Sequence, residues 1–121
     1  MDGTTMLQVA SVLLLLTAAG GAVMALIRLG GKVNPPSWIA MAHGFLAASG
    51  FTLLIYVMMT TGLGTAATFG LILLVVAAIG GVVLNLHYHL KDQLIPSWLL
   101  HTHIALAAVG TGLVCWGAWS L

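Results

Sequence analysis

Charged residues are almost absent from this chain of 121 residues. Lys and Arg together number three and Asp and Glu two, so that 4% of the residues are charged and 61% are hydrophobic. Soluble domains carry about a quarter charged residues. The scarcity of charge excludes a basic surface for nucleic acid and an acidic tail. It predicts a single membrane domain over residues 1–121.

Reactive groups in familiar catalytic patterns are also lacking. The one cysteine, Cys115, cannot form a disulfide within the chain, and no C-x-x-C-H sequence is present to attach a haem covalently. There is no pair of carboxylates, no nucleophile with a neighbouring base and no phosphate-binding loop. We therefore expect no enzyme activity from the chain alone and name no catalytic residue.

Several apolar stretches of the sequence are long enough to cross a bilayer. A helical span needs about 20 residues. The first stretch has no basic flank and is too long for a signal peptide, so we expect it to be retained as a span. Short loops make consecutive helices antiparallel neighbours. We therefore expect an all-α, up-down four-helix membrane bundle. The predicted spans are Met6–Leu29, Ser37–Thr60, Ala66–His89 and Ser97–Ser120.

The two halves of the chain match without a gap when one is shifted by sixty residues. Glycine and alanine recur in any membrane bundle, which is the alternative explanation. A match that includes Pro-Ser-Trp and histidine favours a tandem repeat of two-helix units, 1–60 and 61–121. Each unit crosses the membrane twice, so the repeat is parallel. The matching positions include Gly20-Gly21 with Gly80-Gly81, Pro36-Ser37-Trp38 with Pro96-Ser97-Trp98, His43 with His103, and Gly50 with Gly110.

The few cations predict the orientation of the bundle. Arg28, Lys32 and Lys91 all fall at the first and third loops. Positive residues favour the cytoplasmic side. We expect an integral protein of the bacterial inner membrane, with these loops in the cytoplasm and both termini outside.

Histidines are the candidate functional residues, because ionisable side chains at membrane depth are costly and mark sites. His43 and His103 each lie seven residues past a proline, about 10 Å inside their helices. The second and fourth helices of an up-down bundle are diagonal, so both rings can face the central axis. Two such imidazoles suit the iron of a b-type haem. We expect one haem b per chain, with His43 and His103 as the iron ligands.

Nearby residues fit this site but also have simpler explanations. Gly50 and Gly110 lie seven residues beyond the two histidines and could leave room for a flat macrocycle. They could equally allow close helix packing. Arg28, near the same membrane face, could pair with haem propionates, or it could serve only to orient the protein.

The other histidines belong to the second half alone. His87 shares a helical stripe with Gly80 and Leu84, so we expect it to face inward. His87 and His101 are further candidates for cofactor binding, through a second haem shared between protomers, a proton-conducting or quinone-contacting edge, or a metal site. We expect His89 to be a solvated residue at the membrane surface. The repeat partners of these three histidines are Ile27, Leu29 and Met41.

With His43 and His103 paired within four spans, the chain resembles the small b-type membrane cytochromes and haem-binding anchor subunits of respiratory complexes. The resemblance is one of architecture and covers the whole chain. It implies axial ligation by both histidines, a quinone pocket near the haem, and electron transfer to a partner subunit. Many such proteins hold two haems with four ligands, whereas this chain has one symmetric pair.

Three other functions remain open at this point. The chain could be a cofactor-free accessory subunit, packed in the bilayer against other subunits or against further copies of itself. Copper or zinc could bind His87, His101 and His103, with help from Met41. A chlorophyll-type pigment could bind a histidine that has no partner.

Overall fold

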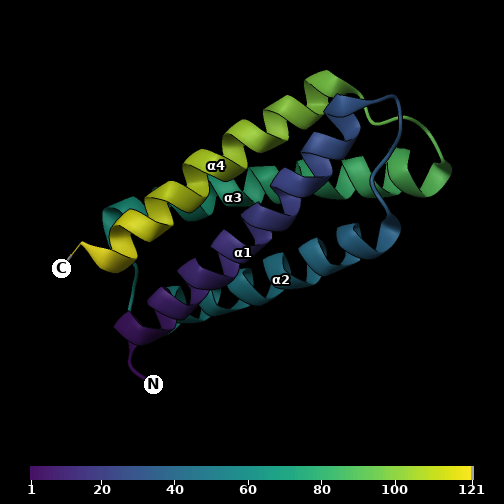
Figure 1. Cartoon of the computed structure of the whole chain (residues 1–121). Helices are drawn as coiled ribbons and strands as arrows, with labels where there is room; N and C mark the ends of the chain where they lie inside the picture. Colours follow the sequence, from purple (N-terminus) through teal and green to yellow (C-terminus); the bar gives the residue numbers. More distant parts are fainter. Residues whose placement is uncertain (121) are drawn as a thin grey trace.

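The computed structural model describes residues 1–120 as an antiparallel bundle of four long helices (Figure 1). Helix α1 spans Gly3–Gly30, α2 Ser37–Thr60, α3 Thr65–Val83 and α4 Ser97–Trp119. Helix α3 continues into a π turn, η1 (Leu84–Tyr88), and a 3₁₀ turn, η2 (His89–Lys91). The all-α, four-helix expectation is confirmed, and each of the four helical segments is long and apolar enough to cross a membrane.

The helix ends follow from local sequence. Helices α2 and α4 begin directly after Pro36 and Pro96, because proline can precede a helix but cannot continue one. The Asp2 side chain caps α1 by accepting a hydrogen bond of 2.7 Å from the Thr5 N–H. Helix α2 ends just before Gly62, which has a φ of 81°, a left-handed conformation that glycine adopts readily.

Tight packing occurs within each half of the chain. Helix α1 packs against α2, α3 packs against α4, and α1 also contacts α4, whereas α2 and α3 meet only weakly. A Cβ atom added at Gly70 would lie 2.7 Å from the Gly110 carbonyl oxygen, and one at Gly110 would lie 2.8 Å from Leu74 Cγ. The glycines therefore let the backbones of α3 and α4 approach each other closely.

The apolar interior has two parts at different levels of the bundle. Along α4, His103 lies between Leu100 of the smaller cluster and Val114 of the larger one, and we call this part of the bundle the histidine level. The smaller cluster, at the end with the longer loops, comprises Leu84, Ile95 and Leu100. The larger, at the end with both termini, comprises Leu7, Ala10, Leu14, Leu54, Ala67, Leu71, Leu74, Val114 and Ala118.

Large apolar side chains are exposed over much of the outer surface. Leu26 is 75% exposed and Met59 77% exposed, which is unfavourable in water and favourable against lipid chains. Polar side chains on this surface bond within their own helices, as when the hydroxyls of Thr52 and Thr102 donate to the carbonyls four residues earlier. Within residues 1–120, every buried side-chain nitrogen and oxygen has a hydrogen-bond partner.

Hydrogen bonds tie the two halves together at both ends of the bundle. Near the termini, the Trp119 indole N–H donates to the Ser11 hydroxyl at 3.0 Å. At the other end, Asn34 joins the first loop to the third. Its amide nitrogen donates to the Gln93 carbonyl at 2.7 Å, and its side-chain oxygen accepts from the Ile95 N–H at 3.0 Å.

We expect Gly110→Ala to destabilise the α3–α4 contact, because the added methyl group would overlap Leu74 and the Gly70 carbonyl. Overpacking of this kind costs about 1–3 kcal/mol. The matched control is Gly112→Ala on the same helix, where an added Cβ meets nothing within 4 Å. Thermal unfolding in detergent, followed by circular dichroism, should show a lower midpoint for Gly110→Ala only. Equal midpoints would contradict this account of the packing.

We also expect Asn34→Ala to lower stability by about 1–3 kcal/mol, because two hydrogen bonds are lost and each contributes about 0.5–1.5 kcal/mol. Asn85→Ala, which alters an exposed amide, serves as the control. The same melting experiment, with limited proteolysis of the loops, measures both effects. If Asn34→Ala melts and resists protease like the unaltered protein, the two loops are not held by this side chain.

Candidate functional site

The candidate site is formed by two histidine rings that approach each other in the first third of α2 and of α4. His43 comes from α2 and His103 from α4, and their ring centres are 6.4 Å apart with the planes inclined by 64°. Both side chains are partly buried. The diagonal approach expected from the sequence is therefore seen.

Each ring is oriented by a backbone carbonyl in the preceding helix. Nδ1 of His43 lies 2.8 Å from the Thr17 carbonyl oxygen, and Nδ1 of His103 lies 2.7 Å from that of Ala77. A carbonyl oxygen only accepts hydrogen bonds, so each Nδ1 carries the hydrogen and donates it. In a neutral ring Nε2 is then left without a hydrogen and is able to bind a metal ion. Both histidines thus have the same tautomer and the same free nitrogen.

Glycines make room for both rings. A Cβ atom at Gly21 would lie 3.0 Å from His43 Cε1, and one at Gly81 would lie 3.1 Å from His103 Cε1. A Cβ atom at either position would make a contact tighter than usual, so the imidazole would have to shift by a few tenths of an ångström, and its Nδ1 hydrogen bond would lengthen. The Gly-Gly pairs of α1 and α3 therefore act as surfaces against which the rings lie.

The spacing of the rings suits one metal ion held between them. Two imidazoles that bind a metal from opposite sides have ring centres roughly 6 Å apart, since each metal–nitrogen bond is about 2.0–2.1 Å long. The observed separation of 6.4 Å agrees with this value. The donor type, the tautomer and the ring separation are compatible with ligation of one metal ion by both histidines, as in b-type haem, if the two Nε2 atoms face each other.

The other candidate histidines do not join this pair. His101 is exposed, and its Nδ1 lies 2.6 Å from the Ser97 carbonyl oxygen of its own helix. His87 is exposed and lies edge-on to Tyr88, with ring centres 4.8 Å apart. The expectation that His87 faces inward is wrong. His87 faces outward because it lies in the π turn. This turn has more residues per turn than an α-helix and so shifts His87 off the helical stripe that contains Leu84.

The remaining candidate residues lie around the site in packing or tethering positions. A Cβ at Gly50 would lie 3.0 Å from the Leu14 side chain, so Gly50 serves the α1–α2 contact, as Gly110 serves α3–α4. Arg28 is partly buried, and its Nε donates to the Ile95 carbonyl at 2.7 Å. Arg28 thereby links α1 to the third loop.

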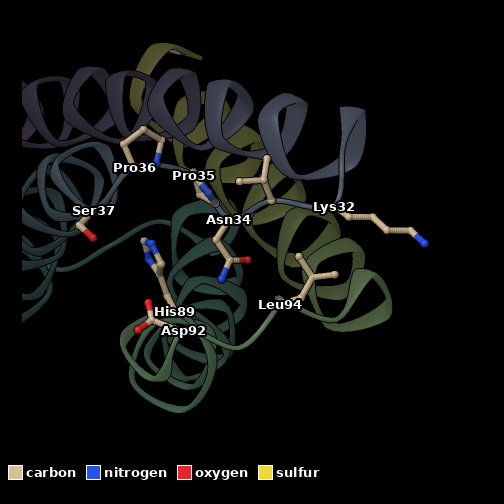
Figure 2. A pocket seen from close by; sticks show the side chains of 9 residues that line it. Lys32, Asn34, Pro35, Pro36, Ser37, His89, Asp92 and Leu94 are labelled. Atoms are coloured by element: carbon tan, nitrogen blue, oxygen red, sulfur yellow. The ribbon is translucent and has the colours of Figure 1, made fainter.

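Two hollows lie along the α2–α3 side of the bundle. A pocket of about 440 Å³ opens where the first loop meets the end of α3, and His89 points into it toward Pro36 and Ser37 (Figure 2). An apolar groove of about 400 Å³ lies deeper, between Phe51 of α2 and a face of α3. The remaining lining residues are Lys32, Val33, Asn34, Pro35, Asp92 and Leu94 in the pocket, and Val75, Ala78, Ile79, Val82 and Val83 in the groove.

A metal site of three or more protein ligands is not formed among residues 1–120, where no three His, Cys, Asp or Glu side chains come close enough together to hold an ion. The grouping of His87, His101 and His103 considered from the sequence is therefore not assembled. Of the histidines considered as ligands, His43 and His103 are the two whose rings lie close together across the bundle.

Sequence reasoning missed the groups that hold the two rings in place. The carbonyls of Thr17 and Ala77 are backbone atoms, which no residue pattern marks as acceptors. Gly21 and Gly81 left a signal, since the Gly-Gly pairs recur sixty residues apart just as the histidines do. The shared spacing of sixty residues could have indicated that Gly21 and Gly81 lie beside the two histidines.

Comparison with known proteins adds no relative. No protein-family model matches the sequence, and no curated protein or solved structure matches the chain.

Proposed function

We propose that this chain is a membrane b-type cytochrome that holds one haem b between His43 and His103. It would carry electrons between a quinone pool or a partner subunit and that haem. The observation that carries the proposal is the histidine pair. Two rings stand at a metal-bridging separation, and each has its Nδ1 bound to a carbonyl and its Nε2 free.

The residues of the chain would bind and tune the cofactor. The carbonyls of Thr17 and Ala77 fix the tautomer of each imidazole and make Nε2 a stronger donor. Gly21 and Gly81 fix the position of each ring. The apolar clusters above and below the histidine level would keep water from the site. Haem bound there supplies an iron that exchanges one electron, with a potential set by its ligands and surroundings.

Residence in a membrane is part of the proposal. Four apolar helices and an apolar outer surface support it. The positions of Arg28, Lys32 and Lys91 favour cytoplasmic loops and external termini. The tandem-repeat origin is supported by the hydrogen bonds of the histidines, since both the rings and their acceptors, Thr17 and Ala77, are sixty residues apart.

The first prediction from this proposal concerns the absorption spectrum. The purified protein should give a reduced-minus-oxidised spectrum of a b-type cytochrome with one haem per chain. His43→Ala and His103→Ala should each lose at least nine-tenths of the signal, because each removes one axial ligand. His101→Ala and His87→Ala are the matched controls and should keep it.

A protein that is purified intact after expression with ample haem, yet shows no haem absorption, would reject the cytochrome. Retention of the full signal in either the His43 or the His103 variant would reject the ligand assignment. Loss of the signal in the His101 variant would do the same.

The second prediction concerns the glycines beside the rings. Gly21→Ala and Gly81→Ala should reduce haem retention about tenfold, because a methyl group at 3.0–3.1 Å from Cε1 displaces the imidazole and overpacking costs about 1–3 kcal/mol. Gly44→Ala, next to His43 but facing open space, is the control. Haem titration of the apoprotein measures all three. Equal affinities would show that these glycines do not position the ligands.

A further inference from the structure

The two histidine rings are held in inclination as well as in distance. Their planes are inclined by 64°, which is nearer to perpendicular than to parallel. The Nδ1 atom of each ring is bonded to a carbonyl of the neighbouring helix, that of Thr17 for His43 and that of Ala77 for His103. The Cε1 atom of each ring lies against a glycine of that same helix. These two contacts leave the ring little freedom to turn about a bond from Nε2 to a metal ion.

The angle between the rings arises from the way in which the two halves of the chain pack together. The His43 ring is held by α1 and the His103 ring by α3, so each half orients its own ring. The histidine and its acceptor are 26 residues apart in both halves, and the glycines correspond as well. Each ring therefore has the same setting within its half, and the inclination of 64° reflects the relation between the halves.

The inclination of two imidazoles bound to one ferric iron decides how far the iron d orbitals are split. The π orbital of an imidazole is perpendicular to its ring plane and interacts with the d orbital that shares its direction. Parallel rings act on the same d orbital and separate it from its neighbour in energy. Rings close to perpendicular act on one d orbital each and leave the two nearly equal. Nearly equal orbitals make the electron paramagnetic resonance (EPR) signal strongly anisotropic, with a large highest g value. Ligand orientation, which the hydrogen bonds of the ligands control, is thus a means of tuning the metal.

We infer that this inclination gives the bound haem a strongly anisotropic low-spin ferric state, and that Gly21 and Gly81 are positioning residues that maintain it. The inference rests on the proposed ligation of haem by His43 and His103. With two d orbitals of nearly equal energy, the unpaired electron is not confined to one direction across the macrocycle. Electron exchange is then not restricted to one pair of opposite haem edges.

The test is the low-temperature EPR spectrum of the ferric protein, recorded beside that of haem with free imidazole in the same detergent. Free imidazoles are not held at an angle by any protein, so their complex is the reference. We expect the highest g value of the protein to lie clearly above that of the reference. A bound haem with a highest g value equal to or below the reference would overturn the inference and leave the ligation intact. Intact protein without haem absorption would reject the ligation, and the inference with it.

The positioning role of the glycines is tested by the same spectrum of Gly21→Ala and Gly81→Ala, each loaded with saturating haem. The added methyl group shifts the ring and lengthens its Nδ1 hydrogen bond, so the ring is free to turn. We expect the highest g value to fall toward the reference and the signal to broaden. Gly44→Ala, which faces open space, is the control and should keep the signal of the unaltered protein. Unchanged g values in both variants at full haem occupancy would show that these glycines do not maintain the inclination.

Discussion

The hydrogen bond from each histidine Nδ1 to a carbonyl of the neighbouring helix is the interaction on which the rest of the site depends. It joins α2 to α1 through His43 and Thr17, and α4 to α3 through His103 and Ala77. It forms where the ring lies directly on the partner backbone, and glycine at positions 21 and 81 leaves room for this, because a Cβ atom there would lie 3.0–3.1 Å from the ring. Because the carbonyl fixes the hydrogen on Nδ1, the Nε2 atom of each neutral ring is left without a hydrogen.

The kind of side chain in the interior changes along the length of the bundle. Apolar side chains fill the end near the termini and, in a smaller cluster, the end with the longer loops. Imidazoles occupy the level between them. Polar tethers join the two halves at both ends, through Trp119 and Ser11 at one and through Asn34 and Arg28 at the other. These hydrogen bonds hold the two halves of the bundle together on either side of the histidine pair.

The two halves correspond at the glycine contacts within each half but differ at other matched positions. Differences occur in the interior, where Ser11 matches Leu71 and Leu7 matches Ala67, as well as on the outside. Residues at the α1–α2 and α3–α4 contacts correspond in position, as with Gly50 against Leu14 and Gly110 against Leu74. The outward differences are in size, as between Ala22 and Val82, and in polarity, as between Leu29 and His89.

The number of helices and the depth of the histidine rings could be predicted from the sequence by itself. Four apolar stretches separated by proline and glycine predicted four helices, since chain length and backbone hydrogen bonding in an apolar medium permit little else. Equal distances from Pro36 to His43 and from Pro96 to His103 predicted rings at equal depth. What only the tertiary structure decided were the backbone acceptors of those rings, the packing role of Gly50 and Gly110, and the outward turn of His87. These depend on contacts between helices and on the π turn at Leu84–Tyr88, and neither residue spacing nor helical periodicity carries that information.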